Sequence, residues 1–318
     1  MHTTKRLWGL GLIAILVAAC STTGGGATPA SPSVASEPPV TEAPASEAAS
    51  PSAEADICTA ANMPTFTPGT FTIGTDNPAY PPYFEIVDEP TDPWELGDPT
   101  TGTGFESAFA YALAEQFGFT KDQVTWTVVP FANSFAPGDK QFDVDINQIS
   151  YEPERAQNVD MSDGYYFVNQ AVVANKGTPA ADAKSLADLK NLRFGAQVGT
   201  TSFKTITDVI APSKDPSVYD TNDAAIAALE AKQIDAIVVD LPTAFFITAA
   251  QMDNGVIVGQ IEQAEDADAE YFSVVLPKDS PLTDCVNGAI AAMQSDGSLD
   301  AITQEWLSDK ANAPVLQP

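Results

Sequence analysis

Arg155 is the residue whose type and position most suggest ligand chemistry. It lies in the polar run 147–156, which continues from a strand expected to begin at Phe142. Pro153 can start a helix, because its missing N–H is not needed there. In a first helical turn a cation opposes the positive end of the dipole, and a bound carboxylate, which suits the planar guanidinium, would remove that conflict. The alternative is a structural ion pair with Glu152, Glu154 or Asp160.

A second candidate site begins where an expected strand ends, in the run 197–202 with the sequence QVGTTS. Gly199 turns the chain, and Thr200 and Thr201 begin a helix. Free backbone N–H groups and hydroxyls at a helix N-terminus can bind an anion. The alternative is plain N-capping by Thr200 or Thr201. The run is neither a dinucleotide fingerprint nor a P-loop, since both need further glycines.

Asp240 follows a short apolar strand expected over 234–239. Burying a carboxylate at such a strand end is costly unless the charge is paired, and an ammonium ligand is one possible partner. The alternatives are a solvated strand-end carboxylate or a helix cap. Asp240 is therefore a candidate for binding a cationic group.

The segment 75–84, TDNPAYPPYF, places rigid prolines and aromatic side chains directly after a strand. These aromatics could form an apolar wall for a ligand side chain, or could simply pack locally. Taken together, the four motifs offer a guanidinium and helix N-terminal donors for a carboxylate, Asp240 for an ammonium group, and aromatics for the remainder. This combination predicts a site for an α-amino acid.

Strands and helices alternate along the chain from about Cys58 onward. Such alternation predicts parallel α/β sheets, in which ligands sit at the carboxyl ends of strands. Strands are expected over 71–76, 124–129, 142–150, 171–174, 193–198, 234–239 and 271–276, and helices over 104–118, 201–210, 222–232 (capped by Asn222), 282–293 and 299–307.

The N-terminus has the pattern of a lipoprotein signal peptide over 1–19. Two basic residues precede an apolar run, 7–17, that is too short to span a bilayer, and small residues precede Cys20. We expect cleavage before Cys20 and acylation of its thiol, for example by palmitate, which would anchor the protein on the extracytoplasmic face of the cell membrane. The alternative is an ordinary secretory signal. The following segment, 20–57, is rich in Ser, Thr, Ala, Pro and Glu and is expected to be a disordered tether.

Composition excludes several kinds of function. The net charge of −29, from 43 acidic and 14 basic residues, disfavours nucleic acid and anionic lipid partners. The single histidine, His2, leaves with the signal peptide, which removes His-based catalysis and most transition-metal sites. Cys58 and Cys285 remain as an even pair in an oxidising compartment, so a disulfide is expected; the alternative is two unpaired thiols.

The run from Ser150 to Arg155, followed by VDMSDGYY over 159–166, resembles the T-P-E-R…V-D-F-S-x-P-Y-Y segment of the family 3 solute-binding proteins of amino-acid ABC importers. The resemblance covers about 68–307. It implies a periplasmic-binding-protein-like fold, in which two α/β lobes are joined by two crossing strands, near 171–175 and 271–276. Lobe one would be 58–172 with 276–318, and lobe two 173–275.

By the same resemblance, Arg155 would clamp the ligand carboxylate with Thr201 and the amides near Thr200. Asp240 would hold the ammonium with Ser150 and the backbone of Gln148, and Tyr80 would stack on the ligand side chain. Glu152, Asn147 and Gln148 depart from the family pattern, as do Met161 and Gly164, and the first three suggest a polar ligand side chain. The full candidate set is Asp76, Tyr80, Asn147, Gln148, Ser150, Glu152, Arg155, Thr200, Thr201 and Asp240.

The resemblance implies a monomeric receptor, without cofactor or metal, that delivers an amino acid to an ABC permease and is not an enzyme. Two other functions are compatible with the sequence. One is a carboxylate-based lyase on the same fold, because some proteins of this fold are dehydratases. The other is a ligand-sensing surface lipoprotein that has no transport partner.

Overall fold

The computed structural model of the chain describes residues 56–262, 269–310 and 313–318. The predicted signal peptide, Cys20 and nearly all of the tether lie outside the described residues, so they stay predictions. Within the described ranges no helix is both long enough and apolar enough to cross a membrane.

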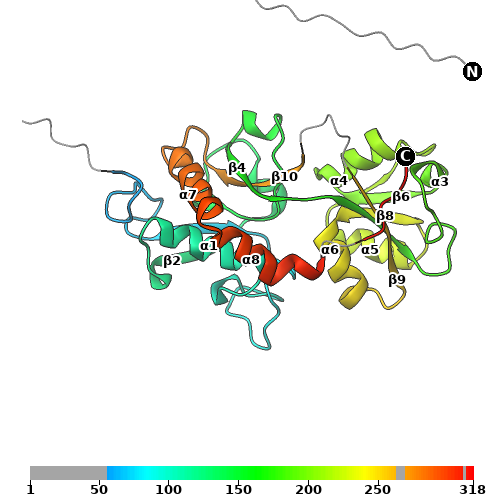
Figure 1. Cartoon of the computed structure of the whole chain (residues 1–318), viewed down its shortest axis with the longest axis horizontal. Coiled ribbons are helices and arrows are strands. Elements are labelled where there is room, and N and C mark those ends of the chain that lie inside the picture. The colour runs from blue at the N-terminus through cyan, green and yellow to red at the C-terminus, as the bar shows by residue number, and fades with distance from the viewer. Residues whose placement is uncertain (1–55, 263–268, 311–312) are drawn as a thin grey trace, which may run out of the picture. The chain divides into compact units, whose positions relative to one another are not determined.

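The described chain contains two five-stranded sheets, each with its own helices (Figure 1). We call the first sheet and its helices lobe one, and the second sheet and its helices lobe two. In lobe one the strand order is β2 (Val124–Val128), β1 (Phe71–Thr75), β3 (Val144–Asp145), β10 (Tyr271–Leu276) and β4 (Asp160–Phe167). In lobe two it is β7 (Ser217–Tyr219), β6 (Phe194–Gln197), β8 (Ala236–Asp240), β5 (Gln170–Asn175) and β9 (Gly255–Ile261).

Both sheets are mixed, whereas the sequence predicted parallel sheets. β1 runs parallel to β2 and β3, and β6 runs parallel to β7 and β8. β10 and β5 run antiparallel to their neighbours. These two strands enter their sheets from the other lobe, and not through the helical crossover that parallel neighbours need.

Helices pack on both sheets, and most of them lie where the apolar periodicity of the sequence predicted a helix. Lobe one has α1 (Phe105–Gln116), α2 (Phe131–Ser134), α7 (Thr283–Asp296) and α8 (Ser298–Leu307). Lobe two has α3 (Leu186–Leu189), α4 (Thr201–Lys204), α5 (Asn222–Glu230) and α6 (Leu241–Phe246); α4 and α6 continue as π-helical turns over Thr205–Ile210 and Ile247–Gln251. In α1, Phe105, Phe109 and Leu113 are fully buried, as the helical spacing predicts. Thr221, not Asn222, caps α5, through its bond from the Ala224 N–H.

Two predicted elements near Arg155 are wrong. The strand expected over 142–150 is reduced to Val144–Asp145, because the chain turns at Gln148, whose φ is 48°. The helix expected to start at Pro153 is a three-residue 3-10 turn, Arg155–Gln157. A single turn has no helix dipole of consequence, so the dipole argument for an anion at Arg155 fails. The segment 159–166 forms most of β4, and α2, α3, α6, β7 and β9 were not predicted.

The crossings lie a few residues from the predicted lobe boundaries. β4 ends at Phe167 in lobe one and β5 begins at Gln170 in lobe two, so the predicted boundary at 172 falls inside β5. β9 and β10 bracket the second crossing, which puts β10 in lobe one. The C-terminal segment, predicted in lobe one, instead hydrogen-bonds to β9, with Leu316 buried in the core of lobe two. Gly259 permits this approach, because a side chain there would meet the carbonyl of Pro314 at 2.7 Å.

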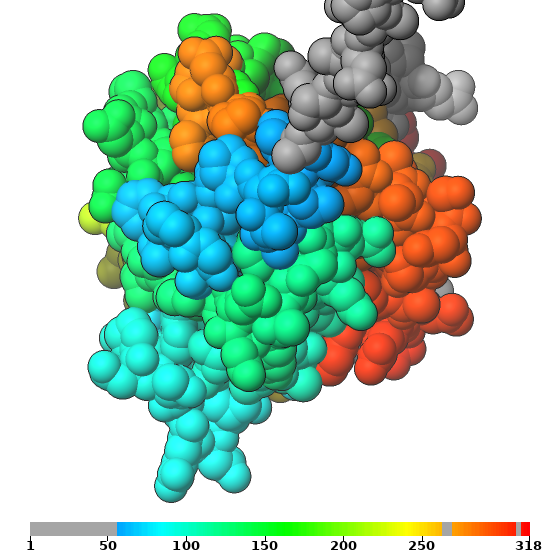
Figure 2. All heavy atoms as spheres, turned by 90° about the vertical axis from the view of Figure 1, so that its left-hand side faces the viewer, coloured from blue at the N-terminus to red at the C-terminus, as the bar shows by residue number. Residues whose placement is uncertain are grey.

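A disulfide joins Cys58 to Cys285 of α7, which confirms the predicted pairing. Cys285 is buried in the core of lobe one, and Cys58 packs against that core. In Figure 2 the N-terminal part of the described chain (blue) and the α7 region (orange) lie side by side on one face of lobe one. The disulfide therefore links the start of the described chain covalently to α7.

Replacing both cysteines, Cys58→Ala with Cys285→Ala, should lower the free energy of unfolding by about 2–5 kcal/mol, because the bond closes a very long loop. The two cysteines are 227 residues apart in sequence. Thermal unfolding measures the loss. Dithiothreitol should destabilise the wild type and leave the double variant unchanged; equal sensitivity of the two proteins would contradict the prediction.

Candidate ligand-binding site

A cavity of about 390 Å³ is lined by residues of both lobes. Lobe one contributes the segment after β1, the turn after β3, and Arg155. Lobe two contributes the segment after β6, the start of α5, and the junction of β8 with α6. The cavity thus lies at the carboxyl ends of β1, β3, β6 and β8, the position expected for a ligand site in α/β sheets.

Arg155 lines this cavity, although its side chain is only 5% exposed. Nη1 donates to the carbonyl of Ser150 at 2.6 Å, and Nη2 donates across the lobes to the carbonyl of Gly199 at 2.8 Å. The guanidinium lies 4.4 Å from the ring centre of Phe135, and Nε forms an ion pair with Glu152 at 3.5 Å. Burial lowers the pKa of Arg155. The ion pair with Glu152, one of the partners named for the structural alternative, is therefore formed by a residue that also lines the cavity.

Asp240 reaches the cavity from lobe two, at the point where β8 ends and α6 begins. Its carboxylate makes no cap hydrogen bond to α6, and Oδ1 accepts from Nε2 of Gln170 at 2.6 Å. Its side chain is partly exposed to the cavity while lying deep in the protein. Burial, followed by the negative charge of Glu270, raises the pKa of Asp240 to about 8. A cation in the cavity would stabilise the ionised form.

Seven more predicted residues line the cavity with Arg155 and Asp240. These are Asp76, Tyr80, Asn147, Gln148, Ser150, Thr200 and Thr201. The hydroxyl of Thr200 donates to the carbonyl of Gln197 and accepts from the N–H of Phe203, so the N-capping alternative holds for that side chain. Nδ2 of Asn147 is buried without a hydrogen-bond partner among the described residues.

Gln148 lines the cavity, and both its backbone N–H and its side-chain amide bind the carboxyl group of Glu106. The Gln148 N–H donates to Oε1 of Glu106 at 2.8 Å, and its side-chain amide donates to Oε2. Glu106 is fully buried in α1 and also accepts from the hydroxyl of Tyr165 at 2.5 Å. Burial raises the pKa of Glu106 to about 7. The carboxyl group of Glu106 therefore fixes the turn after β3 through two hydrogen bonds to Gln148.

Glu152, predicted near the ligand side chain, does not line the cavity. Its carboxylate is 2.5 Å from Nζ of Lys204, at the end of α4 in lobe two, and 3.5 Å from Nε of Arg155. Ionic attraction to these two cations turns the side chain away from the ligand space. Glu152 is therefore an interlobe ion-pair residue in this structure.

Lys204→Ala should raise the rate of ligand dissociation about two- to fivefold, since an exposed ion pair contributes roughly 0.5–1 kcal/mol. The side chain of Lys204 is 46% exposed. Stopped-flow fluorescence at low and high salt measures the effect, and added salt should shrink the difference. Lys190→Ala, in lobe two outside the cavity, is the control. An unchanged rate at low salt would contradict the role of this pair.

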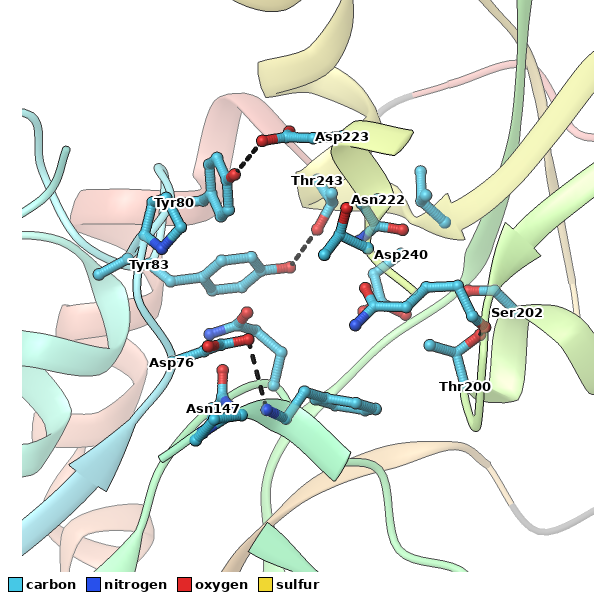
Figure 3. A pocket seen from close by; sticks show the side chains of 18 of the residues that line it. Asp76, Tyr80, Tyr83, Asn147, Thr200, Ser202, Asn222, Asp223, Asp240 and Thr243 are labelled. Atoms are coloured by element: carbon cyan, nitrogen blue, oxygen red, sulfur yellow. Dashed lines mark hydrogen bonds between the residues drawn. The ribbon is translucent and has the colours of Figure 1, made fainter. Parts of the chain in front are cut away.

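Two phenols that point across the cavity add further contacts between the lobes (Figure 3). The hydroxyl of Tyr80 donates to Oδ2 of Asp223 at 2.5 Å, and the hydroxyl of Tyr83 lies 3.2 Å from Oγ1 of Thr243. Tyr80 also lies 6.2 Å, ring centre to ring centre, from Phe246. The aromatic segment after β1 therefore lines one side of the cavity, and its two phenols form interlobe hydrogen bonds that were not predicted.

A sequence model of the bacterial extracellular solute-binding proteins, family 3, matches residues 84–309. The chain belongs to this family. Among the described residues, no group of three or more His, Cys, Asp or Glu side chains is arranged to hold a metal ion.

Curated relatives of this family 3 protein include two from Escherichia coli (strain K12). The L-cystine-binding protein TcyJ is 29% identical over 241 residues, which cover 75% of this chain and 82% of the relative. The ABC transporter arginine-binding protein 1 is 30% identical over 210 residues, covering 64% and 81%. A solved structure of an ancestral arginine-binding protein bound to arginine matches with a TM-score of 0.58 and 26% identity, over 74% of this chain and 97% of that one. The predicted two-lobe fold is confirmed.

Sequence reasoning missed several residues at the site of this family 3 protein. Tyr83 stands in the aromatic motif and could have been singled out there, and Asp223 follows directly after a helix start. Gln170 and Glu270 carry no local signal. They lie at the two crossings, 100 residues apart, and meet only in the folded chain.

Proposed function

We propose that this protein is the extracytoplasmic substrate-binding component of an ABC importer, and that it encloses an amino acid between its lobes. The observation that carries the proposal is that Arg155 of lobe one and Asp240 of lobe two face the same cavity. A carboxylate on the first and an ammonium on the second would make the ligand a bridge between the lobes. Such a ligand binds the closed state better and shifts the population toward it.

Relatives of this chain that are named as cystine-binding and arginine-binding proteins support this proposal.

We further propose that the protein is a monomer held at the membrane by lipid on Cys20. Metabolic labelling with palmitate tests the anchor: the wild type should be labelled, Cys20→Ala should not, and a labelled variant would reject the assignment.

The lining of the cavity supports a polar ligand side chain that is rich in hydrogen-bond donors. Asp76, Asp220 and Asp223 lie around the cavity in addition to Asp240, whereas Arg155 is the single Lys or Arg among the described lining residues. With Arg155 assigned to the α-carboxylate, a second carboxylate on the ligand would face acidic groups without a partner, which costs several kcal/mol in a buried site.

Calorimetry with the twenty standard amino acids tests function and ligand class together. We expect tightest binding for ligands whose side chains donate hydrogen bonds, with glutamate at least about tenfold weaker than the best of them, because like charges repel. Asp76→Asn should narrow that gap, and Asp88→Asn, outside the cavity, should not. Tight binding of leucine-like ligands alone would overturn the polar assignment, and no binding of any amino acid would overturn the function.

Reversible binding without turnover is part of the proposal. A structural neighbour with 26% identity is an ancestral amino acid-binding protein described as a precursor of cyclohexadienyl dehydratase, so turnover is worth measuring. After long incubation the bound ligand should be recovered unchanged; a product would favour an enzyme. Loss of uptake of labelled amino acid on deletion would distinguish a transport receptor from a surface sensor.

A further inference from the structure

Glu270, at the second crossing, joins the two lobes through a hydrogen-bonded network behind the cavity. Its Oε1 accepts from the hydroxyl of Ser150 in lobe one at 2.6 Å. Nε2 of Gln170 in lobe two lies 3.2 and 3.3 Å from the two carboxylate oxygens of Glu270, and 2.6 Å from Oδ1 of Asp240. Two carboxylates therefore share one amide group next to the cavity.

The orientation of Gln170 is set by its other end. The hydroxyl of Ser202 donates to Oε1 of Gln170 at 2.7 Å, so the NH₂ group must point at the two carboxylates. Each donor of the network is thereby assigned an acceptor.

This assignment decides what Ser150 can offer to a ligand. A hydroxyl has one hydrogen, and Glu270 takes that of Ser150. Ser150 lines the cavity, and its hydroxyl oxygen keeps lone pairs that can accept from an incoming donor. Oδ2 of Asp240 is likewise not bonded to Gln170. Both groups accept hydrogen bonds, as an ammonium ligand requires.

We propose that Glu270 is a positioning residue for the ammonium subsite: it turns Ser150 into an acceptor, adds a second negative charge beside Asp240, and so selects an α-ammonium over an α-hydroxyl. This inference rests on the proposed function, because it assumes an α-amino acid in the cavity.

The charges around Asp240 are consistent with this role. Glu270 and Glu106 oppose its ionisation and Arg155 favours it. The phenols of Tyr83 and Tyr166 also interact electrostatically with Asp240. Removing the negative charge of Glu270 should therefore ease ionisation of Asp240.

Glu270→Gln keeps the shape of the side chain and removes its charge, and Glu262→Gln, an exposed carboxylate in the same connection, is the matched control. In the ligand-free protein, the carbon-13 NMR titration midpoint of the Asp240 carboxyl should fall by about one pH unit in Glu270→Gln and stay unchanged in the control. An unchanged midpoint in both variants would overturn the proposed charge effect.

Selectivity is tested with the tightest-binding standard amino acid and the α-hydroxy acid that has the same side chain. The wild type should prefer the amino acid, and Glu270→Gln should reduce that preference at least about tenfold. Ser150→Ala should produce a similar loss, and the double variant should lose little more, since the two residues act together. If both single variants kept the wild-type preference for the amino acid over the hydroxy acid, the inference would be overturned and the proposed function would stand. If the wild type bound no amino acid, the function would be overturned, and the NMR titration of Asp240 would still test the charge effect of Glu270.

Discussion

Arg155→Ala should weaken amino-acid binding at least about 100-fold, because an ionised ligand carboxylate loses its only buried cationic partner among the described lining residues. The loss should appear mainly in the dissociation rate. Isothermal calorimetry gives the affinity, and circular dichroism shows whether the fold persists. Arg155→Lys should recover only part of the affinity, since an ammonium cannot reproduce the planar fork.

The matched control is Arg193→Ala, the other arginine in the described part of the chain. Arg193 pairs with Asp235 at 2.6 Å in lobe two and does not line the cavity. This variant should bind the ligand normally. Arg155 also donates to the carbonyls of Ser150 and Gly199, so Arg155→Ala should lower stability somewhat. A folded Arg155→Ala protein with wild-type affinity would remove the basis of the site assignment.

Asp240→Asn should weaken binding of α-amino acids about 100-fold while changing the affinity for their deaminated analogues by less than about threefold, because it removes the charge that pairs with the ammonium. It should also remove a pH dependence. Ligand ammonium binds the ionised carboxylate, and the pKa of Asp240 is raised to about 8. Wild-type affinity should therefore rise with pH between about 6 and 8, by up to about tenfold per unit for one proton, and level off above the raised pKa.

Calorimetry at several pH values, in buffers of different ionisation enthalpy, measures both the affinity and the protons released on binding. Asp223 lines the same cavity but hydrogen-bonds to Gln251 and not to Gln170. The variant Asp223→Asn should therefore keep the pH dependence of the affinity. If Asp240→Asn lost equal affinity for amino acids and deaminated analogues, Asp240 would have a structural role, and the ammonium subsite would have to lie elsewhere.

Much of the fold follows from local patterns in the sequence. The spacing of Phe105, Phe109 and Leu113 predicts α1, and the apolar run of β5 predicts a strand buried on both faces, which is how it lies. The cavity residues Arg155, Thr201 and Asp240 were predicted because each stands directly after a strand or in a polar motif, and the carboxyl ends of strands meet at one edge.

What could not be predicted depends on partners that are distant in sequence. Glu152 looked like a ligand residue because nothing local shows that Lys204 faces it from the other lobe. Gln170 and Glu270 gave no signal because their role depends on contacts with residues distant in sequence. Gln170 hydrogen-bonds to Asp240, and Glu270 accepts from Ser150. The C-terminal segment was misplaced because its pairing with β9 depends on Gly259, whose missing side chain leaves room for that segment.

The bond between Cys58 and α7 also determines which part of the molecule would stay still when the chain is pulled. Tension on residues before Cys58 passes through a covalent link into the core of lobe one, and does not first strip β1 from its sheet. Lobe two is joined to lobe one through the two crossings, through the C-terminal segment that follows α8 and pairs with β9, and through the contacts of the cleft described above. In a protein moored by its N-terminal arm, lobe one would be the stationary half and lobe two the half that swings.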